Sequence, residues 1–227
     1  MSWWKRLWRS RVAPSSHGSI GAVRLALDGW SEKAPTGGMR IWRDARGDVL
    51  SLAAFDASFG LPDISDESAL RLWCRLLAEK RHAGLVEVRV VEGALGMATS
   101  LIYKQLQKPA YIFTGMLVVP RQEGHQVWTV VARERGTTGM REAVVTTELI
   151  GAGKLTIEEY ERSWAQDPYD PAYSGVDRSV LRFVSDDECF DERFPEHPLS
   201  KVRRVLAALP DAVQVESGVP VLYGNRM

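Results

Sequence analysis

One segment of the chain, residues 61–84, has a clear helical pattern of apolar and polar positions. Its apolar residues recur three and four positions apart, and charged residues fill the other side. Asp63 or Ser65 can cap the start of this helix, and Gly84 follows its end. The pattern therefore predicts an amphipathic helix that packs on another element. The side chains expected on its packed side are Leu70, Trp73, Cys74, Leu77 and Arg81.

Short apolar runs with alternating polarity predict β-strands on both sides of this helix. Before it, "MRIWRDARGDVLSLAAF" predicts two short strands that turn at Asp44–Gly47. After it, four strand candidates follow one another, and the loop "PRQEGH" joins the last two. Those two strands are apolar on both faces, which is typical of central strands covered on both sides. The four candidates are Leu85–Val91, Ala98–Tyr103, Ala110–Val119 and Val127–Arg135.

Three further helices are expected in the second half of the chain, at Gly139–Ile150, Thr156–Ala165 and Pro198–Leu209. The second begins with "TIEE", the pattern of a capping box, and the third carries Pro at a favoured first position. The order of elements and the short hairpin loops predict an α+β fold. We expect a predominantly antiparallel β-sheet flanked by helices, an α/β/α sandwich.

Changes in composition divide the chain into three parts. Residues 1–19 are a basic, aromatic N-terminal tail that ends in the linker-like stretch "APSSHGS". Residues 20–165 are expected to form the α+β core domain. Residues 166–227 are expected to form a C-terminal extension, in which an acidic loop and an amphipathic helix pack on the core.

The first residues of the tail, "MSWWKRLWRSRV", combine tryptophans with basic side chains, and no acidic residue precedes Asp28. A short helix of this composition is typical of a segment that binds an anionic membrane surface. We therefore predict a weak peripheral membrane contact. Two alternatives stay open, a frayed terminus and a tail whose tryptophans pack on the body, because so short a helix is marginal alone in water. The residues predicted to contact the membrane are Trp3, Trp4, Trp8 and Arg9.

The composition is that of an ordinary globular protein, with 45% hydrophobic and 26% charged residues. Basic and acidic residues number 29 each, so the chain lacks the excess positive charge of a nucleic-acid-binding protein. Its longest apolar run, "YIFTGMLVVP", is about half as long as the ~20 residues of a membrane-spanning helix. The N-terminus lacks the apolar stretch of a secretory signal. We therefore expect a cytoplasmic protein, and the excess of Arg over Lys indicates a bacterial source.

No sequence motif predicts a cofactor or a catalytic group. "GAGKLT", residues 151–156, is not a phosphate-binding loop, because Glu148 and Leu155 stand where that motif needs Gly and Ser or Thr. The acidic segment "SDDECFDERFPEH", residues 185–197, lacks the ligand spacing of a calcium loop. We interpret it as a solvated acidic loop or a docking surface for a basic partner. None of the four histidines lies in a metal-ligand or nucleophile motif. We therefore predict no catalytic residue, no cofactor and no metal site.

The string "RERGTTGMREA", residues 133–143, is the remaining candidate for a site. Glu134 is expected to face a covered side of the sheet, where it needs a partner, and Arg141 is the nearest candidate in sequence. The functional alternative uses Thr138 and the amides of a helix start to hold an anion, with Arg141 as the counter-charge. The residues of this candidate ligand site are Glu134, Arg135, Thr138 and Arg141.

The run from "IWRDARGDVLSLAAF" through "ALRLWCRLLAEKRHAG" to "YIFTGMLVVP" and "WTVVARERGTTGMREAV" resembles bacterial proteins of unassigned function. Their element order is similar to the PsbP-like fold, which the Ran-binding nuclear import factor shares. The resemblance rests on element order and covers roughly residues 20–165. It implies an antiparallel sheet flanked by helices and a binding or accessory role, and it carries over no functional residue.

Two hypotheses for the function follow. The first is a non-catalytic bacterial accessory or protein-interaction protein, whose partner is another protein; an immunity-type protein that neutralises a toxin is a specific version. The alternative is an enzyme or small-anion-binding protein with its site at the turn of residues 133–142. A deep pocket at this turn would favour the alternative, whereas a filled, ion-paired turn would favour the first.

Overall fold

The computed structural model describes residue 20 and residues 23–56, 59–121 and 124–215. The predicted membrane contact through Trp3, Trp4, Trp8 and Arg9 lies outside the described residues, as does the linker that ends at residue 19.

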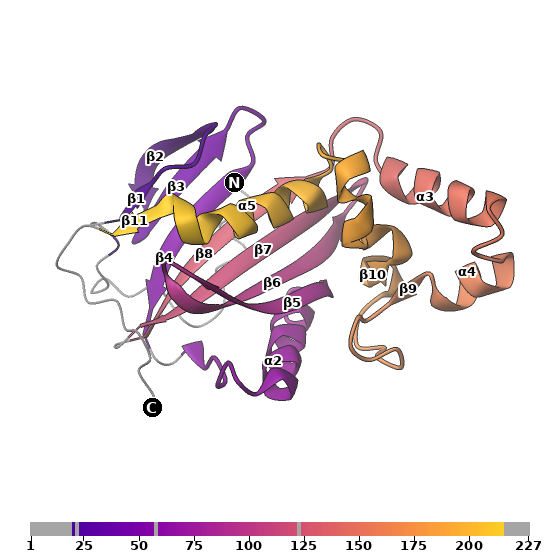
Figure 1. The fold of residues 1–227 in the computed structure, drawn as a ribbon, viewed down its shortest axis with the longest axis horizontal. Helices are drawn as coiled ribbons and strands as arrows, with labels where there is room; N and C mark the ends of the chain where they lie inside the picture. Colours follow the sequence, from indigo (N-terminus) through magenta and orange to yellow (C-terminus); the bar gives the residue numbers. More distant parts are fainter. Residues whose placement is uncertain (1–19, 21–22, 57–58, 122–123, 216–227) are drawn as a thin grey trace.

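The centre of the fold is a seven-stranded antiparallel sheet (Figure 1). Its strand order is β2-β3-β4-β8-β7-β6-β5, so two meanders meet where β4 pairs with β8. This pairing aligns Leu50 with Val130 and Leu52 with Trp128. The sheet strands are β2 (Trp30–Thr36), β3 (Met39–Asp44), β4 (Val49–Phe55), β5 (Gly84–Gly93), β6 (Gly96–Gln107), β7 (Ala110–Arg121) and β8 (Gly124–Arg133).

One face of the sheet is covered by helix α2 (Glu67–Glu79), which connects β4 to β5. Leu70, Cys74 and Ala78 are its buried residues, and they pack on strand residues such as Val118. The N-cap is Asp66, whose side chain accepts a hydrogen bond from the Ala69 N–H. The prediction of Asp63 or Ser65 as the cap is therefore wrong. Asp63 instead accepts hydrogen bonds from the N–H and hydroxyl of Ser65, one turn ahead of the helix.

The opposite face is covered by helix α5 (Pro198–Ala212), which lies along β7 and β8 (Figure 1). Its apolar stripe joins the larger core cluster, together with Trp42, Phe113 and Trp128 of the sheet. Gly115 in β7 lies directly below this helix, and an added Cβ there would stand 2.6 Å from atoms of Val202 and Leu206. The apolar residues that α5 buries in this cluster are Leu199, Val202, Val205, Leu206 and Leu209.

Because β7 and β8 lie between two helical layers, both of their faces are apolar. Phe113, Leu117 and Val119 of β7 belong to the cluster under α5, whereas Met116 and Val118 belong to the cluster under α2. This arrangement confirms the predicted α+β fold with an antiparallel sheet flanked by helices. The division of the chain at residues 19 and 165 stays a prediction.

The segment between β8 and α5 lies at one end of the sheet (Figure 1). It has a small core of its own, which includes Val145, Leu155, Trp164 and Phe183. Its elements are α3 (Met140–Gly151), α4 (Ile157–Ser163), β9 (Ala165–Gln166), β10 (Arg182–Phe183) and the 3-10 helices η2 (Arg178–Val180), η3 (Val184–Asp186) and η4 (Glu188–Arg193). Beyond α5, β11 (Val213–Val215) pairs with β1 (Val23–Leu25).

The loop after β9 forms hydrogen bonds with α2 and with the edge strand β5. Arg75 forms a two-bonded ion pair with the fully buried carboxylate of Asp167. The Tyr169 hydroxyl accepts a hydrogen bond from the Val88 N–H and donates one to the Val88 carbonyl. Since these are backbone groups of an edge strand, Tyr169 occupies hydrogen-bonding positions that a further strand would use.

Candidate functional site

The turn that joins β8 to α3 has the left-handed backbone conformation that its glycines predict. Gly136 and Gly139 have φ angles of 72° and 74°, a conformation that other residues rarely adopt. Gly139 is the N-cap residue of α3. The glycines of "RERGTTGMREA" are therefore explained by a strand that ends and a helix that begins.

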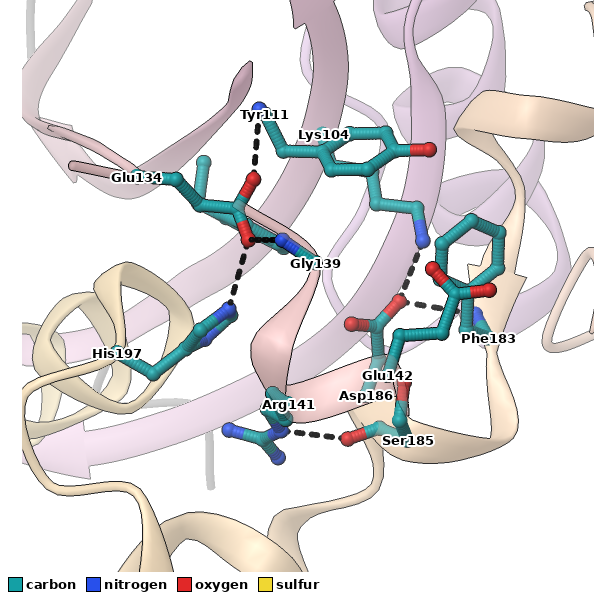
Figure 2. Close-up of a pocket in the computed structure, with 11 residues that line it drawn as sticks. Lys104, Tyr111, Glu134, Gly139, Arg141, Glu142, Phe183, Ser185, Asp186 and His197 are labelled. Carbon is teal, nitrogen blue, oxygen red and sulfur yellow. Dashed lines mark hydrogen bonds and ion pairs between the residues drawn. The ribbon is translucent and has the colours of Figure 1, made fainter. Parts of the chain in front are cut away.

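Glu134 is almost completely buried in this turn. Its carboxylate accepts hydrogen bonds from the Tyr111 N–H at 2.9 Å and the Gly139 N–H at 3.1 Å. Nε2 of His197 lies 3.5 Å from the same carboxylate (Figure 2). Burial alone would raise the pKa of Glu134, but His197 and the two backbone donors bring the pKa below its usual value. Glu134 is therefore an anion whose partners come from β7, α3 and the start of α5.

Arg141 is 2% exposed and points away from Glu134. Its guanidinium donates to the Ser185 carbonyl at 2.6 Å and to the Asp187 carbonyl at 2.7 Å. It also donates to Asp191 Oδ1 and to the Ser200 hydroxyl, each at 2.8 Å. The expected pairing of Glu134 with Arg141 is therefore wrong: His197 is the partner of Glu134, and Asp191 is the partner of Arg141.

The four residues of the candidate ligand site do not converge on one point. Arg135 donates to Asp48 Oδ1 at 2.8 Å, on the side of the turn that faces β4. Glu134 and Arg141 both line the small cavity described below, and Arg135 and Thr138 are not among its lining residues. Whether these four residues bind a ligand stays a prediction.

A buried lysine lies next to this turn. Lys104 of β6 is almost inaccessible to solvent, and its Nζ lies 2.6 Å from Oδ2 of Asp186. The ammonium also lies 3.1 Å from the centre of the Phe183 ring. Burial lowers the pKa of Lys104 and by itself would raise that of Asp186, but Lys104 holds the pKa of Asp186 below its usual value. The geometry is that of a buried ion pair.

Glu142 faces the same interior from the first turn of α3. Its Oε1 accepts a hydrogen bond from Trp164 Nε1 at 2.9 Å, and the Tyr160 hydroxyl lies at 3.5 Å. Burial raises the pKa of Glu142, against the effect of these two donors and of Lys104. It therefore differs from Glu134, whose surroundings favour the charged form.

These groups enclose a small cavity of about 10 Å³, which is at the lower limit for one water molecule (Figure 2). A substrate-sized pocket is larger by more than an order of magnitude. The turn is therefore filled and ion-paired, the arrangement that favours a structural role for Glu134 and Arg141. The residues that line the cavity are Lys104, Tyr111, Phe113, Glu134, Gly139, Arg141, Glu142, Phe183, Ser185, Asp186 and His197.

The acidic segment of residues 185–197 contributes two largely buried carboxylates, those of Asp186 and Asp191, to the interior. Asp186 pairs with Lys104, and Asp191 pairs with both Arg141 and Arg203. Glu188 forms a short contact with Arg89, and Glu196 lies 2.6 Å from Arg46. The interpretation of this segment as a solvated acidic loop is therefore wrong for Asp186 and Asp191, whereas Glu188, Glu192 and Glu196 are exposed. The ion pairs fix residues 185–197 onto the sheet and helices.

Within the described residues, no three His, Cys, Asp or Glu side chains are grouped so that they could hold a metal ion. Cys74 is buried and Cys189 is exposed, and both are free thiols; burial raises the pKa of Cys74 to about 12. Among the helices in the described ranges, none is both long and apolar enough to span a membrane.

The sequence reveals part of this site. Glu134 follows β8 and continues the alternating positions of Trp128, Val130 and Ala132, which are all apolar. Lys104 lies two positions after Ile102 in β6 and therefore faces the same covered side of the sheet. This alternation is the signal that could have identified Lys104. The partners of these residues, His197 and Asp186, are distant in sequence and carry no local signal.

Comparison with known proteins does not assign the chain to a family. No family model matches it, and no curated protein matches its sequence. Among solved structures, it is similar to the crystal structure of LpqN, a protein involved in cell envelope biogenesis of Mycobacterium tuberculosis. The two share 14% sequence identity, the match covers 66% of this chain and 92% of LpqN, and the TM-score is 0.32. At these values the match supports no statement about function.

Proposed function

We propose that this chain is a non-catalytic protein-interaction protein, and that helix α3 presents its binding surface. The observation that supports the proposal is the polarity of this helix, which buries an arginine and exposes two large apolar side chains, although it also buries Val145. Arg141 and Val145 are its buried residues, and Glu142 is half-buried, whereas Met140 is 51% exposed. A surface helix normally buries its apolar residues and exposes its charges.

The exposed side of α3 forms a continuous stripe. Its members recur three or four positions apart and therefore lie next to one another on the helix surface. The Thr147 hydroxyl already donates a hydrogen bond to the Ala143 carbonyl, so its proton is not available to another group. Ile157, at the start of α4, adds a further exposed apolar side chain. The members of the stripe are Met140, Ala143, Thr147 and Ile150. Exposed apolar side chains gathered on one surface are typical of a protein-binding site.

The burial of Arg141 has an energetic basis. Burying a guanidinium costs free energy unless it is fully paired, and Arg141 obtains its partners from Ser185, Asp187, Asp191 and Ser200. This arrangement holds α3 in one orientation, with Met140 and Ile150 outward. A partner that covers the stripe would bury apolar area that the isolated chain leaves in water.

Several finer predictions belong to this proposal. A bacterial, cytoplasmic accessory role, an immunity-type function and the PsbP-like resemblance all agree with a binding protein, and they stay proposals. The alternative, an enzyme or small-anion-binding protein with its site at residues 133–142, is less well supported, because the cavity there has room for about one water molecule.

The test is affinity purification of the tagged full chain from cells of its native host, with identification of the molecules that co-elute. The variant Met140→Ser/Ile150→Ser removes the two largest side chains of the stripe. Met97→Ser is the matched control, because Met97 is 44% exposed at the end of the β5–β6 hairpin, away from α3. We expect a partner protein that co-elutes with the wild type and the control, and that is lost from the α3 variant.

Two results would contradict the proposal. Recovery of a small molecule without any protein would favour the alternative function. Equal recovery of the partner with both variants would show that α3 is not the binding surface.

A further inference from the structure

The sheet face that carries α2 continues beyond this helix, across β3, β4 and β8. Ser51 of β4 pairs with Thr129 of β8, and Thr129 pairs with Met116 of β7. Met116 belongs to the cluster under α2, so this row of side chains faces the α2 side of the sheet. Positions two residues away in the same strands face the same side. We call the resulting surface the strip, and its residues are Ile41, Val49, Ser51, Thr129 and Val131.

The strip is buried. Ser51, its most accessible residue, is 8% exposed. In the described part of the chain, however, Ile41, Val49 and Val131 belong to none of the clusters of packed apolar residues. Helix α2 packs on β5, at the far edge of the sheet, and α5 covers the opposite face (Figure 1). Side chains on one face of a sheet are buried only where other groups cover them, so we expect the cover to come from outside the described ranges.

Thr129 indicates the chemistry of this cover. Its side chain is 4% exposed, and among the described residues its hydroxyl has no hydrogen-bond partner. A buried hydroxyl without a partner costs free energy, so the covering group is expected to supply one. An indole ring is apolar and carries a single N–H donor. Tryptophan therefore fits a strip in which a hydroxyl lies between aliphatic side chains.

The N-terminal tail, residues 1–19, has the composition that this surface requires. Helical spacing would place Trp4, Leu7 and Trp8 on one side of a helix. Each tryptophan that becomes buried removes about 150–250 Å² from water, so two of them can cover a strip of short side chains. The C-terminal residues 216–227 also lie outside the described ranges, but their one aromatic residue is Tyr223. The composition therefore favours the N-terminal tail as the cover.

The tail joins the described structure close to the strip. The Ile20 carbonyl accepts a hydrogen bond from Nη1 of Arg40 at 3.1 Å, and Arg40 precedes Ile41 in β3. Ile20 packs on the α5 side, so the tail has to pass around the edge of the sheet to reach the strip. The stretch from Trp8 to Ile20 reaches up to about 40 Å when extended. The distance across the sheet from β3 to β8 is only about 10 Å.

We propose that the N-terminal segment of this chain, residues 3–8, packs on the strip as a further layer of the fold. Trp4 and Trp8 cover its apolar residues, and one indole N–H donates a hydrogen bond to the Thr129 hydroxyl. The tryptophans are thereby assigned to the body of the protein and not to a membrane surface. The proposal is independent of the binding function proposed for α3.

The first experiment measures how far the tail protects the strip from a thiol reagent. In a Cys189→Ser background, Ser51→Cys places a reporter thiol in the strip, and the other cysteine, Cys74, is buried. We expect slow labelling by a maleimide with the wild-type tail. Adding Trp4→Ser/Trp8→Ser should accelerate labelling about tenfold or more, because the reaction no longer waits for the tail to detach. The control Leu222→Ser/Tyr223→Ser, in the C-terminal segment, should leave labelling slow.

Three results of this experiment would overturn the proposal. Fast labelling with the wild-type tail would show that the strip is open. Slow labelling that the tail variant does not change would assign the cover to other residues, and so would acceleration by the C-terminal variant alone. Circular dichroism confirms that each variant is folded.

The second experiment tests the hydrogen bond to Thr129. Thr129→Val keeps the shape of the side chain and removes the hydroxyl. In nuclear magnetic resonance spectra of the indole N–H groups, this change should shift one signal strongly, and the same signal should be missing from Trp4→Ser/Trp8→Ser. If every shifted signal persists in the tail variant, the tail does not donate to Thr129.

The third experiment separates docking on the body from membrane binding. The full chain is sedimented with vesicles of phosphatidylcholine and phosphatidylserine. We expect the wild type to stay in the supernatant, because its tryptophans are already packed. Pelleting of the wild type that is lost in Trp4→Ser/Trp8→Ser would assign the tail to an anionic membrane and overturn the proposal.

Discussion

The Nζ atom of Lys104 lies 2.6 Å from Oδ2 of Asp186, and both side chains are almost completely buried. Lys104 belongs to β6 of the central sheet, whereas Asp186 ends η3, 82 positions further along the chain. The same Asp186 oxygen accepts a hydrogen bond from the Phe183 N–H at 2.8 Å. The ion pair therefore joins the segment that follows α4 to the sheet.

Removing one partner of this pair should destabilise the fold strongly. Lys104→Met leaves the Asp186 carboxylate buried and uncompensated, which costs about 3–5 kcal/mol of unfolding free energy, measured by urea denaturation at pH 7. Replacing both partners, in Lys104→Met/Asp186→Leu, should recover much of this loss because no lone charge is left inside. Lys154→Met, on the exposed turn after α3, is the control and should behave as wild type. A double variant no more stable than Lys104→Met would contradict this account.

Arg141 is expected to support the fold rather than bind an anion. Arg141→Ala removes four hydrogen bonds and leaves Asp191 with one cationic partner fewer, so the unfolding free energy should fall by about 3–5 kcal/mol. Arg193→Ala, which breaks an exposed pair with Glu148, should cause little change.

A second measurement separates this structural role from ligand binding at Arg141. Low millimolar phosphate or sulfate should leave the melting temperature of the wild type unchanged, because the buried guanidinium already donates four hydrogen bonds to protein oxygens. A stabilisation by these anions that disappears in Arg141→Ala would instead support the anion-binding alternative.

Most of the fold could be predicted from the sequence, since its elements follow local patterns. The strands β7 and β8 are apolar on both faces, which places them between two layers, and α2 and α5 carry clear apolar stripes. The cap of α2 was misplaced because Asp63, Ser65 and Asp66 lie within four positions and all have side chains that can cap a helix, so the local sequence does not distinguish Asp66 from the two expected caps.

The site was less predictable, because its contacts join segments that are distant in sequence. Glu134 was expected to need a partner, but the choice between Arg141 and His197 depends on where α5 begins on the sheet. The acidic residues 185–197 show the same limit. Composition suggests a solvated loop, which describes the exposed glutamates of the segment. It does not reveal that Asp186 and Asp191 turn inward to basic side chains of three other elements, Lys104, Arg141 and Arg203.

The ionisation of Glu134 should stabilise the fold at neutral pH. Its folded pKa lies below its unfolded value of about 4.3, so its contribution is present above that value and is lost as the pH falls through the folded pKa. Glu134→Gln places an amide group against the N–H donors of Tyr111 and Gly139 and should cost about 1–3 kcal/mol at pH 7. The difference from wild type should shrink below pH 4, measured by urea unfolding across pH 3–7. A difference independent of pH would show that packing, and not charge, is responsible.

Glu142 should show the opposite dependence on pH. Burial raises its folded pKa above the unfolded value, so the folded state binds the proton more tightly and stability is lost as the pH rises between the two pKa values. Glu142→Gln keeps the oxygen that accepts the Trp164 hydrogen bond and removes the buried charge. We therefore expect this variant to be more stable than the wild type at pH 7–8 and to lose that advantage below about pH 4. Glu148→Gln, at an exposed position of the same helix where Arg193 lowers the carboxyl pKa, should show no such gain. If Glu142→Gln is instead less stable than wild type at pH 8, the carboxylate is charged in the folded protein and is stabilised by Lys104.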